Sequence, residues 1–548
     1  MKINLRREFV LVIILAIAFF IRFFRLSELM IFGGDVAREY IAARDMILQG
    51  NIPLIGCPTS IIWLHQGPIF VYLLGIILPF GKFNPLTGGV FFSFIGVISV
   101  FVIYKLGSIL FSKSTGLYGA LLYSTSPLVV LFDRYPYYHS LISLVIMLFF
   151  LSLYYSFNPP SRNSPVVSSN EVENIFRYGR IFPPLAGSRQ PAVTALTKPG
   201  TRRYLAKRIV ENSLQSGSES FKKNTKYILL SFLLFGILMQ LELSSIIFFP
   251  VLALLVLDFH KQIKLKYLIS GIFIFIFTWT AKIIYDFSSG FTQTVGYIYW
   301  LGYRILPLKI GNKTAGFYPL DLRFSKIFTE FQKMIFWPSF WISIFILTAC
   351  LYFLIKNFSI KHRREHLGEY LIILWFIFPV TALFIHGSPE GSYSPALFAL
   401  PGLLIGNFVN KQKSYLKLIL IGLMVVLVFY NAVFLINNDY FMITGHDTKY
   451  KQKYNFGEPI QAAKEIALYI VNDSRGEKFN LIPLGDFAYF PSAKQNLVYL
   501  SWYFGNQPSE KEEKIKYFVY YKYDKKEIVG VNYSKEFPNM IISKRITE

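Results

Sequence analysis

Long apolar runs dominate the first 436 of the 548 residues. The runs are about 15 to 22 residues long, and a helix needs about 20 mostly apolar residues to cross a bilayer. Hydrophobic residues make up 53% of the chain and charged residues only 16%, and the mean hydropathy is +0.43. Soluble domains carry about 25% charged residues. The sequence therefore predicts an all-α polytopic membrane domain over most of the chain.

Eleven of these runs are predicted to cross the membrane. The run 66–80 is short for a span and is bracketed by Pro68 and Pro79, so we expect an interfacial or re-entrant helix there. Gln240 and Glu242 interrupt the run 227–257, which we expect to be a hairpin of two short helices. The predicted spans are roughly 9–26, 86–104, 116–132, 140–157, 227–241, 244–257, 267–286, 336–356, 369–386, 393–409 and 416–436.

The charges of the loops indicate the orientation. Lys and Arg number 56 against 32 Asp and Glu, a net charge of +24, and they cluster in short segments between the apolar runs. This pattern is typical of cytoplasmic loops, so it indicates a membrane topology and no nucleic-acid partner. The first run follows Lys2, Arg6 and Arg7 without a small-residue cleavage site, so we expect a retained helix and a cytoplasmic N-terminus. The segments then expected on the extracytoplasmic side are 27–85, 133–139, 240–244, 287–335, 386–393 and 437–548.

Two parts of the chain differ from the rest in composition. Residues 158–226 are rich in Ser, Pro, Arg and Asn, and their few apolar residues cannot offset the entropy of ordering them. We expect a disordered cytoplasmic insertion, which divides the membrane domain into 1–157 and 227–436. Residues 437–548 are more polar and predict a small soluble α/β domain, with a helix over 457–471 and strands at NLIPLG and KYFVYY.

The first candidate site is the motif GGDVAREYIAARDM, which follows the first apolar run. Asp35 lies near the start of a predicted helix, and Arg38 lies one turn further on. A carboxylate at the membrane edge can act as general base toward a hydroxyl, with Arg38 keeping it ionised or binding a phosphate. The alternative is a helix N-cap with a local ion pair, and the motif alone does not decide between the two.

Further segments expected on the outer side combine basic and aromatic residues. In WLHQGPIFVYLLG, His65 and Gln66 offer hydrogen bonds to a phosphate or sugar, with helix capping as the alternative. In SPLVVLFDRYPYYHS, Arg134 and His139 lie with three tyrosines in a turn that fits a phosphate with its sugar, or else is a simple interface turn. Arg22, at the outer end of the first helix, either joins this site or extends to lipid phosphates.

Ionisable residues also occur near the expected membrane edge. They are Glu242 at the hairpin tip, Asp286 at the outer end of its helix, and His386 with Tyr393 in FIHGSPEGSYSPALFALPG. Such residues are costly at membrane depth unless they face a cavity or a partner, although a solvated hairpin tip would remove that cost. We interpret all four as candidate contacts to an acceptor or a sugar.

In this order, the motifs resemble those of the multi-spanning lipid-linked sugar transferases of the GT-C type, which include protein O-mannosyltransferases and lipid A aminoarabinose transferases. The resemblance lies in GGDVAREYIAARDM, HQGPIFVYLLG, YKLGSILFSKSTGLYGALLYSTSPLVVLFDRYPYYHSLISL and SYSPALFALPGLL. It covers about residues 5–155 well and 225–436 more loosely. Three positions differ from the residues common in that class. Val36 stands in place of an acidic residue, Gln66-Gly67 in place of Lys-Pro, and His139 in place of a second Asp. These differences indicate a divergent subgroup.

The resemblance implies a glycosyltransferase that moves a hexose or pentose from a polyprenyl-phosphate donor to a hydroxyl of a lipid, glycan or protein. Asp35 would be the general base of an inverting, metal-independent reaction, and Arg134 would bind the donor, helped by Arg38 and by Arg22 or His65. No cofactor is implied, and the outer loops hold no DxD metal pair. With only Cys57 and Cys350, the chain has neither a disulfide framework nor a CxxC metal site.

Two other classes stay open. A transporter or flippase of lipid-linked sugars or lipids would also present a basic cavity at the membrane face. Such proteins usually have related halves and helices broken near the midplane, and the sequence indicates neither. A membrane scaffold without enzymatic activity would leave the outer ionisable groups unexplained.

Overall fold

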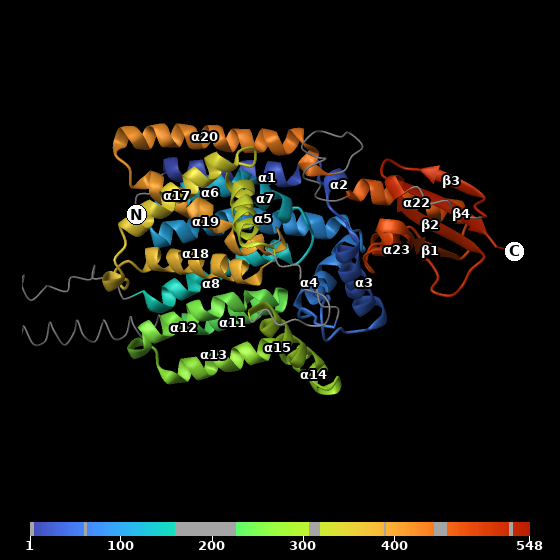
Figure 1. Cartoon of the computed structure of the whole chain (residues 1–548), viewed down its shortest axis with the longest axis horizontal. Coiled ribbons are helices and arrows are strands. Elements are labelled where there is room, and N and C mark those ends of the chain that lie inside the picture. Colours follow the sequence, from blue (N-terminus) through green and yellow to red (C-terminus); the bar gives the residue numbers. More distant parts are fainter. Residues whose placement is uncertain are drawn as a thin grey trace, which may run out of the picture.

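The computed structural model describes residues 5–59, 63–158, 226–305, 318–387, 391–442, 458–524 and 530–547. Long helices lie side by side along the longest axis of the molecule, and a small domain with a β-sheet stands beyond one end of them (Figure 1). The architecture is therefore an all-α polytopic membrane domain with a small C-terminal α/β domain, as the sequence predicts. The predicted insertion 158–226 lies almost wholly outside the described residues.

The helices before the insertion are α1 (Leu5–Phe23), α2 (Leu26–Leu29), α3 (Gly34–Gln49), α4 (Ile69–Ile77), η1 (Leu78–Gly81), α5 (Leu86–Leu110), α6 (Lys113–Thr125), α7 (Pro127–Asp133) and α8 (His139–Phe157). Those after it are α11 (Tyr227–Leu241), η3 (Leu243–Phe248), α12 (Phe249–Asp258), η4 (His260–Gln262), α13 (Leu265–Thr278), α14 (Thr280–Ser288), α15 (Thr292–Ile305), α16 (Leu320–Ile335), α17 (Phe340–Lys356), η5 (Ile360–His362), α18 (Leu367–His386), η6 (Gly391–Leu397), α19 (Ala399–Asn410), α20 (Ser414–Asn437) and η7 (Asp439–Phe441).

Among the described residues, five helices are long and apolar enough to cross a membrane, and the number is eight if each of three bent pairs counts as one span. The sequence predicts eleven crossings; the lower number reflects helices such as α11 and α12 that are too short to count alone. The bent pairs are α6 with α7 (69°), α13 with α14 (60°) and α16 with α17 (91°). The sequence analysis predicts none of these three bends.

The sequence explains where two of the breaks occur. Pro127 begins α7, and because proline has no N–H it cannot continue the hydrogen bonds of α6. Glu242 adopts an extended conformation (φ −149°, ψ 113°) that ends α11, and its carboxylate caps η3 by accepting from the Ser244 N–H at 3.2 Å. The run 227–257 is thus two short helical segments broken at Glu242, as predicted.

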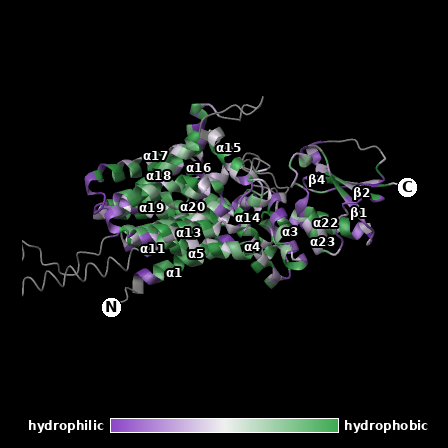
Figure 2. Ribbon diagram, turned by 90° about the horizontal axis from the view of Figure 1, so that it is seen from below, coloured by the Kyte–Doolittle hydropathy of each residue, from purple (hydrophilic) through white to green (hydrophobic). Residues whose placement is uncertain are grey.

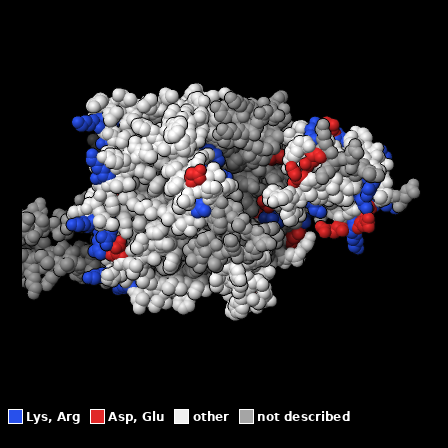
Figure 3. All heavy atoms as spheres, viewed as in Figure 1, with Lys and Arg blue, Asp and Glu red and all other residues white. Residues whose placement is uncertain are grey.

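The surface of the membrane domain is sorted by polarity. Apolar residues cover the helices along most of their length, and polar residues gather at the ends and in the small domain (Figure 2). Lys and Arg gather at the end of the membrane domain that faces away from the small domain (Figure 3). This separation is the one expected of a membrane protein whose basic loops lie on one side.

The small domain contains a four-stranded mixed sheet in the order β1-β2-β4-β3, in which β1 and β2 are parallel and the other neighbours are antiparallel. Its elements are α22 (Ile460–Ser474), β1 (Phe479–Pro483), η8 (Gly485–Ala488), α23 (Gln495–Tyr503), β2 (Ile515–Tyr521), η9 (Lys522–Asp524), β3 (Tyr533–Glu536) and β4 (Met540–Ile546). The predicted helix and both predicted strands are confirmed. The apolar face of α22, made of Ile460, Ala463, Ile466 and Ile470, is buried as its spacing predicts.

The small domain is joined to the segment after α1 by main-chain contacts. The Ile460 N–H donates to the Met30 carbonyl at 2.7 Å, and Ile31 forms a β-bridge with Pro459. The segment before α3 and the segment before α22 are therefore in direct contact.

Candidate active site

Asp35 lies in the first turn of α3, at the junction of the two domains. Gly33 occupies the N-cap position, so Asp35 is not the capping residue that the alternative interpretation requires. Its Oδ1 lies 3.2 Å from Arg38 Nη1 and accepts a hydrogen bond from the Ser492 hydroxyl at 2.7 Å. The Asp35 side chain is 53% exposed. A carboxylate held on one side and open on the other can accept a proton from an incoming group.

Arg38 also contacts Glu39, the next residue on α3, at 3.4 Å. Glu39 is buried, and burial raises the pKa of its carboxyl to about 7, although Arg38 acts in the opposite direction. The sequence analysis did not single out Glu39, because a glutamate in a polar helix carries no signal of burial. Arg38 thus stands between an exposed carboxylate and a buried carboxyl.

Gln66 and Glu242, predicted from separate segments, come together at the hairpin tip. The Gln66 side chain accepts a hydrogen bond from the Leu243 N–H at 2.9 Å, and the Gly67 N–H donates to the Gln240 carbonyl at 2.8 Å. A Cβ atom at Gly67 would meet the end of the Gln240 side chain, which would have to move. The Tyr138 hydroxyl donates to the Glu242 carboxylate at 3.4 Å.

His65 is held by α14 and α15. The main-chain N–H of His65 donates to Gln293 Oε1 at 2.9 Å, and its main-chain carbonyl accepts from the buried Lys282 amine. Burial lowers the pKa of His65, and the charges of Lys282 and Arg38 act in the same direction. Lys282 escaped the sequence analysis because it lies inside a run predicted as a span. The Asp286 carboxylate caps the start of α15, because it accepts from the main-chain N–H of Gln293 at 2.7 Å and of Thr294 at 2.9 Å.

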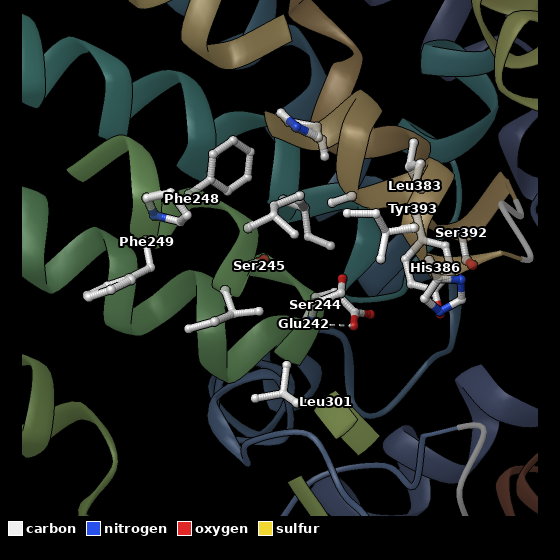
Figure 4. A pocket seen from close by; sticks show the side chains of 18 of the residues that line it. Glu242, Ser244, Ser245, Phe248, Phe249, Leu301, Leu383, His386, Ser392 and Tyr393 are labelled. Atoms are coloured by element: carbon white, nitrogen blue, oxygen red, sulfur yellow. Dashed lines mark hydrogen bonds between the residues drawn. The ribbon is translucent and has the colours of Figure 1, made fainter. Parts of the chain in front are cut away.

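A cavity of about 380 Å³ adjoins Glu242. Its walls are mostly apolar and come from α8, η3, α12, α15, α18 and η6. Figure 4 shows Glu242 and Ser244 at one side and His386 with Tyr393 and Ser392 at another. The rings of His386 and Tyr393 lie 4.8 Å apart. Three of the four predicted acceptor or sugar contacts therefore line one cavity.

The Asp35 cluster and this cavity share neighbours. The Tyr137 hydroxyl contacts Cys57 Sγ at 3.6 Å, and Cys57 interacts electrostatically with Arg38, Glu39 and Glu242. This region thus contains Arg38, Glu39, Cys57 and Glu242, and Glu242 lines the apolar cavity.

The structure does not bring Arg22 and Arg134 to this region by any contact described. Arg22 forms a buried ion pair with Asp133 at 2.7 Å. Arg134 donates to the carbonyls of Arg22 and Phe24 at 2.9 and 2.8 Å, and its guanidinium lies 3.7 Å from the centre of the Tyr440 ring. These contacts suit a structural role, and the predicted donor contact of both arginines stays a prediction.

His139 lies closer to the cavity. Its ring stacks on Tyr138 at 4.1 Å, and Tyr138 is the residue that contacts Glu242. Within the described ranges, neither ring nitrogen of His139 has a hydrogen-bond partner.

Comparison with solved structures identifies the architecture. ArnT from Cupriavidus metallidurans, solved bound to undecaprenyl phosphate, matches with a TM-score of 0.54, at 10% sequence identity, over 97% of this chain and 97% of that one. The chain has the GT-C fold, as ArnT does. No family model and no curated protein sequence matches it.

Two further matches have lower TM-scores. The oligosaccharyltransferase of Archaeoglobus fulgidus, in its apo form, matches 89% of this chain at 13% identity with a TM-score of 0.44. This chain spans about 64% of that enzyme's length. AglB from the same organism, solved with an inhibitory peptide and a dolichol-phosphate, matches with a TM-score of 0.46 at 12% identity over 89% of this chain and 63% of that one.

Proposed function

We propose that the chain transfers a sugar from a polyprenyl-phosphate donor to an acceptor hydroxyl on the extracytoplasmic side of the membrane. The observation that carries the proposal is the half-exposed Asp35, which among the described residues is held at Oδ1 alone, by Arg38 and Ser492. The GT-C fold supports the same activity, since ArnT is a protein of this fold that was solved with a lipid phosphate bound.

In this reaction Asp35 takes the proton of the acceptor hydroxyl while the acceptor oxygen attacks the anomeric carbon. The bond between that carbon and the phosphate oxygen breaks, and the phosphate leaves from the opposite face with the bonding electron pair, which inverts the configuration. The departing phosphate gains negative charge and needs cations that are already in place. Arg38 and Lys282 are the groups that we assign to this task, with His65 as a hydrogen-bond donor beside them.

The cavity suits the other parts of the substrates. Its apolar walls match the prenyl chain, and the carboxylate of Glu242 is a hydrogen-bond acceptor that suits sugar or acceptor hydroxyls and repels a phosphate. His386 and Tyr393 add polar groups at the same cavity. We therefore place the sugar or the acceptor near Glu242 and the phosphate near Arg38 and Lys282.

The bent helix pairs leave a transporter of lipid-linked sugars as the competing function. One experiment separates the two. Membranes of the native host, with and without the gene, are incubated with undecaprenyl phosphate carrying ¹⁴C-labelled glucose, galactose, mannose or arabinose. We expect one label to leave the undecaprenyl-phosphate fraction only when the gene is present, and Asp35→Asn to prevent this. Label that stays on the lipid while it crosses the membrane would overturn the proposal in favour of transport.

A further inference from the structure

Ser492 of the small domain touches the group that we propose as the base. It is buried, at 8% exposure, and its hydroxyl donates to Asp35 Oδ1 at 2.7 Å. The serine is held in a turn by main-chain hydrogen bonds from Ala493 to Phe490 (3.0 Å) and from Gln495 to Ser492 (2.9 Å). The turn leads directly into α23, so the position of Ser492 depends on where α23 lies.

The helix α23 is docked firmly against α3 and the loop before α5. The Tyr499 hydroxyl donates to the Phe83 carbonyl at 2.7 Å, and its ring meets the Tyr40 ring edge-on at 5.6 Å. The Arg44 guanidinium lies 4.7 Å from the centre of the Trp502 ring. Because Tyr40 and Arg44 belong to α3, these contacts fix Ser492 relative to Asp35.

Gly34 makes this approach possible. A Cβ atom at Gly34 would collide with the carbonyl oxygen of Ser492, so any other residue would push the loop away from α3. The second glycine of GGDVAREYIAARDM therefore allows the loop that holds Ser492 to approach α3.

The contacts of Asp35 are one-sided. Arg38 and Ser492 both lie at Oδ1, and within the described part of the chain no hydrogen bond reaches Oδ2. The titratable groups that face Asp35 are Arg38 and Glu39 on α3 and Tyr135 in the turn after α7. A general base must present a lone pair to the proton that it takes, so fixing one oxygen determines where the other one points.

We infer that Ser492 is a positioning residue through which the small domain aims Asp35 Oδ2 at the acceptor hydroxyl. The inference rests on the proposed function and extends it, because the active site then consists of groups from both domains. Ser492 acts through Asp35 and does not itself touch the reacting atoms.

The test measures consumption of the labelled undecaprenyl-phosphate sugar that the full-length protein accepts. Ser492→Ala should lower kcat about tenfold, the effect of losing one hydrogen bond to a charged group, and leave the donor KM within about twofold of wild type. Ser492→Thr keeps a hydroxyl and should restore most of the rate. Ser501→Ala is the matched control, because Ser501 is a buried serine of α23 whose hydroxyl has no partner among the described residues.

A double variant separates positioning from simple docking of the domain. In an Asp35→Asn background, Ser492→Ala should cause no further loss if it acts through Asp35, whereas a docking defect would lower the residual rate again. A wild-type kcat in Ser492→Ala, an equal loss in Ser501→Ala, or additive losses in the double variant would overturn the inference. A wild-type rate in Asp35→Asn would instead overturn the proposed function itself.

The contact can also be tested without turnover. In a full-length protein carrying Cys57→Ala and Cys350→Ala, the pair Asp35→Cys and Ser492→Cys should be joined by a short thiol cross-linker, detected by mass spectrometry of the linked peptides. The pair Asp35→Cys and Ser501→Cys should not be joined. Absence of the first cross-link would overturn the inference whatever the sugar.

Discussion

Two groups of charged residues lie near the end of the membrane domain that faces the small domain, and they differ in how far they are exposed. The Arg22 and Asp133 side chains are 0% and 3% exposed and form an ion pair at 2.7 Å. Asp35 is 53% exposed and is held at one oxygen. Both groups consist of residue types that chemistry at a phosphate would need. Their geometry indicates that the first stabilises the fold and that the second is open to a substrate.

The largest expected effect comes from Asp35→Asn, which preserves shape and removes basicity. Transfer of label from the undecaprenyl-phosphate sugar should fall about 10²- to 10⁴-fold, the range for loss of general base catalysis. Donor KM should change little, because Asp35 is not a phosphate ligand. Transfer at the wild-type rate would show that Asp35 is not the base and would move that role to another carboxylate of the region, with Glu242 the first to test.

The buried pair should respond in stability instead. Asp133→Ala leaves Arg22 charged and without its partner, which should destabilise the fold by about 3 to 5 kcal/mol. Thermal unfolding in detergent measures this, and the double variant Arg22→Met with Asp133→Leu should recover much of the loss. A raised donor KM with unchanged stability would show instead that Arg22 contacts the phosphate, as the sequence analysis predicts.

Glu39 sharpens the comparison, because it lies on the same helix as Asp35 yet is buried. Its folded-state pKa of about 7 lies above the ordinary value of 4.5, so the folded protein binds more protons between these values. Stability should therefore fall as the pH rises through this window, by about 3 kcal/mol in total. Unfolding midpoints between pH 5 and 8 should show this slope in wild type and in the exposed control Glu28→Gln, and not in Glu39→Gln. A slope that survives in Glu39→Gln would assign it to other groups.

The smallest effect concerns Lys282, a buried cation that the sequence analysis missed. Lys282→Met removes the charge and keeps much of the volume, so donor KM should rise about tenfold, the equivalent of about 1.4 kcal/mol. Lys326→Met is a suitable control, because both amines lie over an aromatic ring: that of Lys282 is 5.3 Å from the centre of the Trp279 ring, and that of Lys326 is 3.7 Å from the centre of the Tyr318 ring. Equal donor KM values in the two variants would place the phosphate elsewhere.

The features that could be predicted from the sequence are local ones. The length of the apolar runs predicts the membrane helices, and the spacing of Ile460 and its neighbours predicts the buried face of α22. The spacing of Asp35 and Arg38, three residues apart on one helix, predicts their ion pair. Each depends on residues within a turn or two of one another. The breaks at Pro127 and Glu242 are local as well, and the sequence analysis predicts only the one at Glu242.

The features that could not be predicted depend on long-range contacts. Nothing near Ser492 in the sequence indicates that its hydroxyl donates a hydrogen bond to Asp35. Nothing near Arg134 indicates that its guanidinium packs on the Tyr440 ring and donates to carbonyls at the end of α1. From the sequence, a lysine within an apolar run, such as Lys282, is expected at a membrane edge. Its hydrogen bond to the His65 carbonyl is visible only in the structure. Burial and partner choice are decided by tertiary packing, which one sequence does not reveal.

Asp35 and Ser492 are separated by 457 positions in the chain. A ribosome synthesises the N-terminal helices first, and these can insert while most of the protein does not yet exist. The loop with Ser492 emerges near the end of synthesis and can reach α3 only after the small domain has folded. The junction at Gly34 is therefore among the last to close during biogenesis, and the assembly of the candidate active site coincides with the completion of the protein.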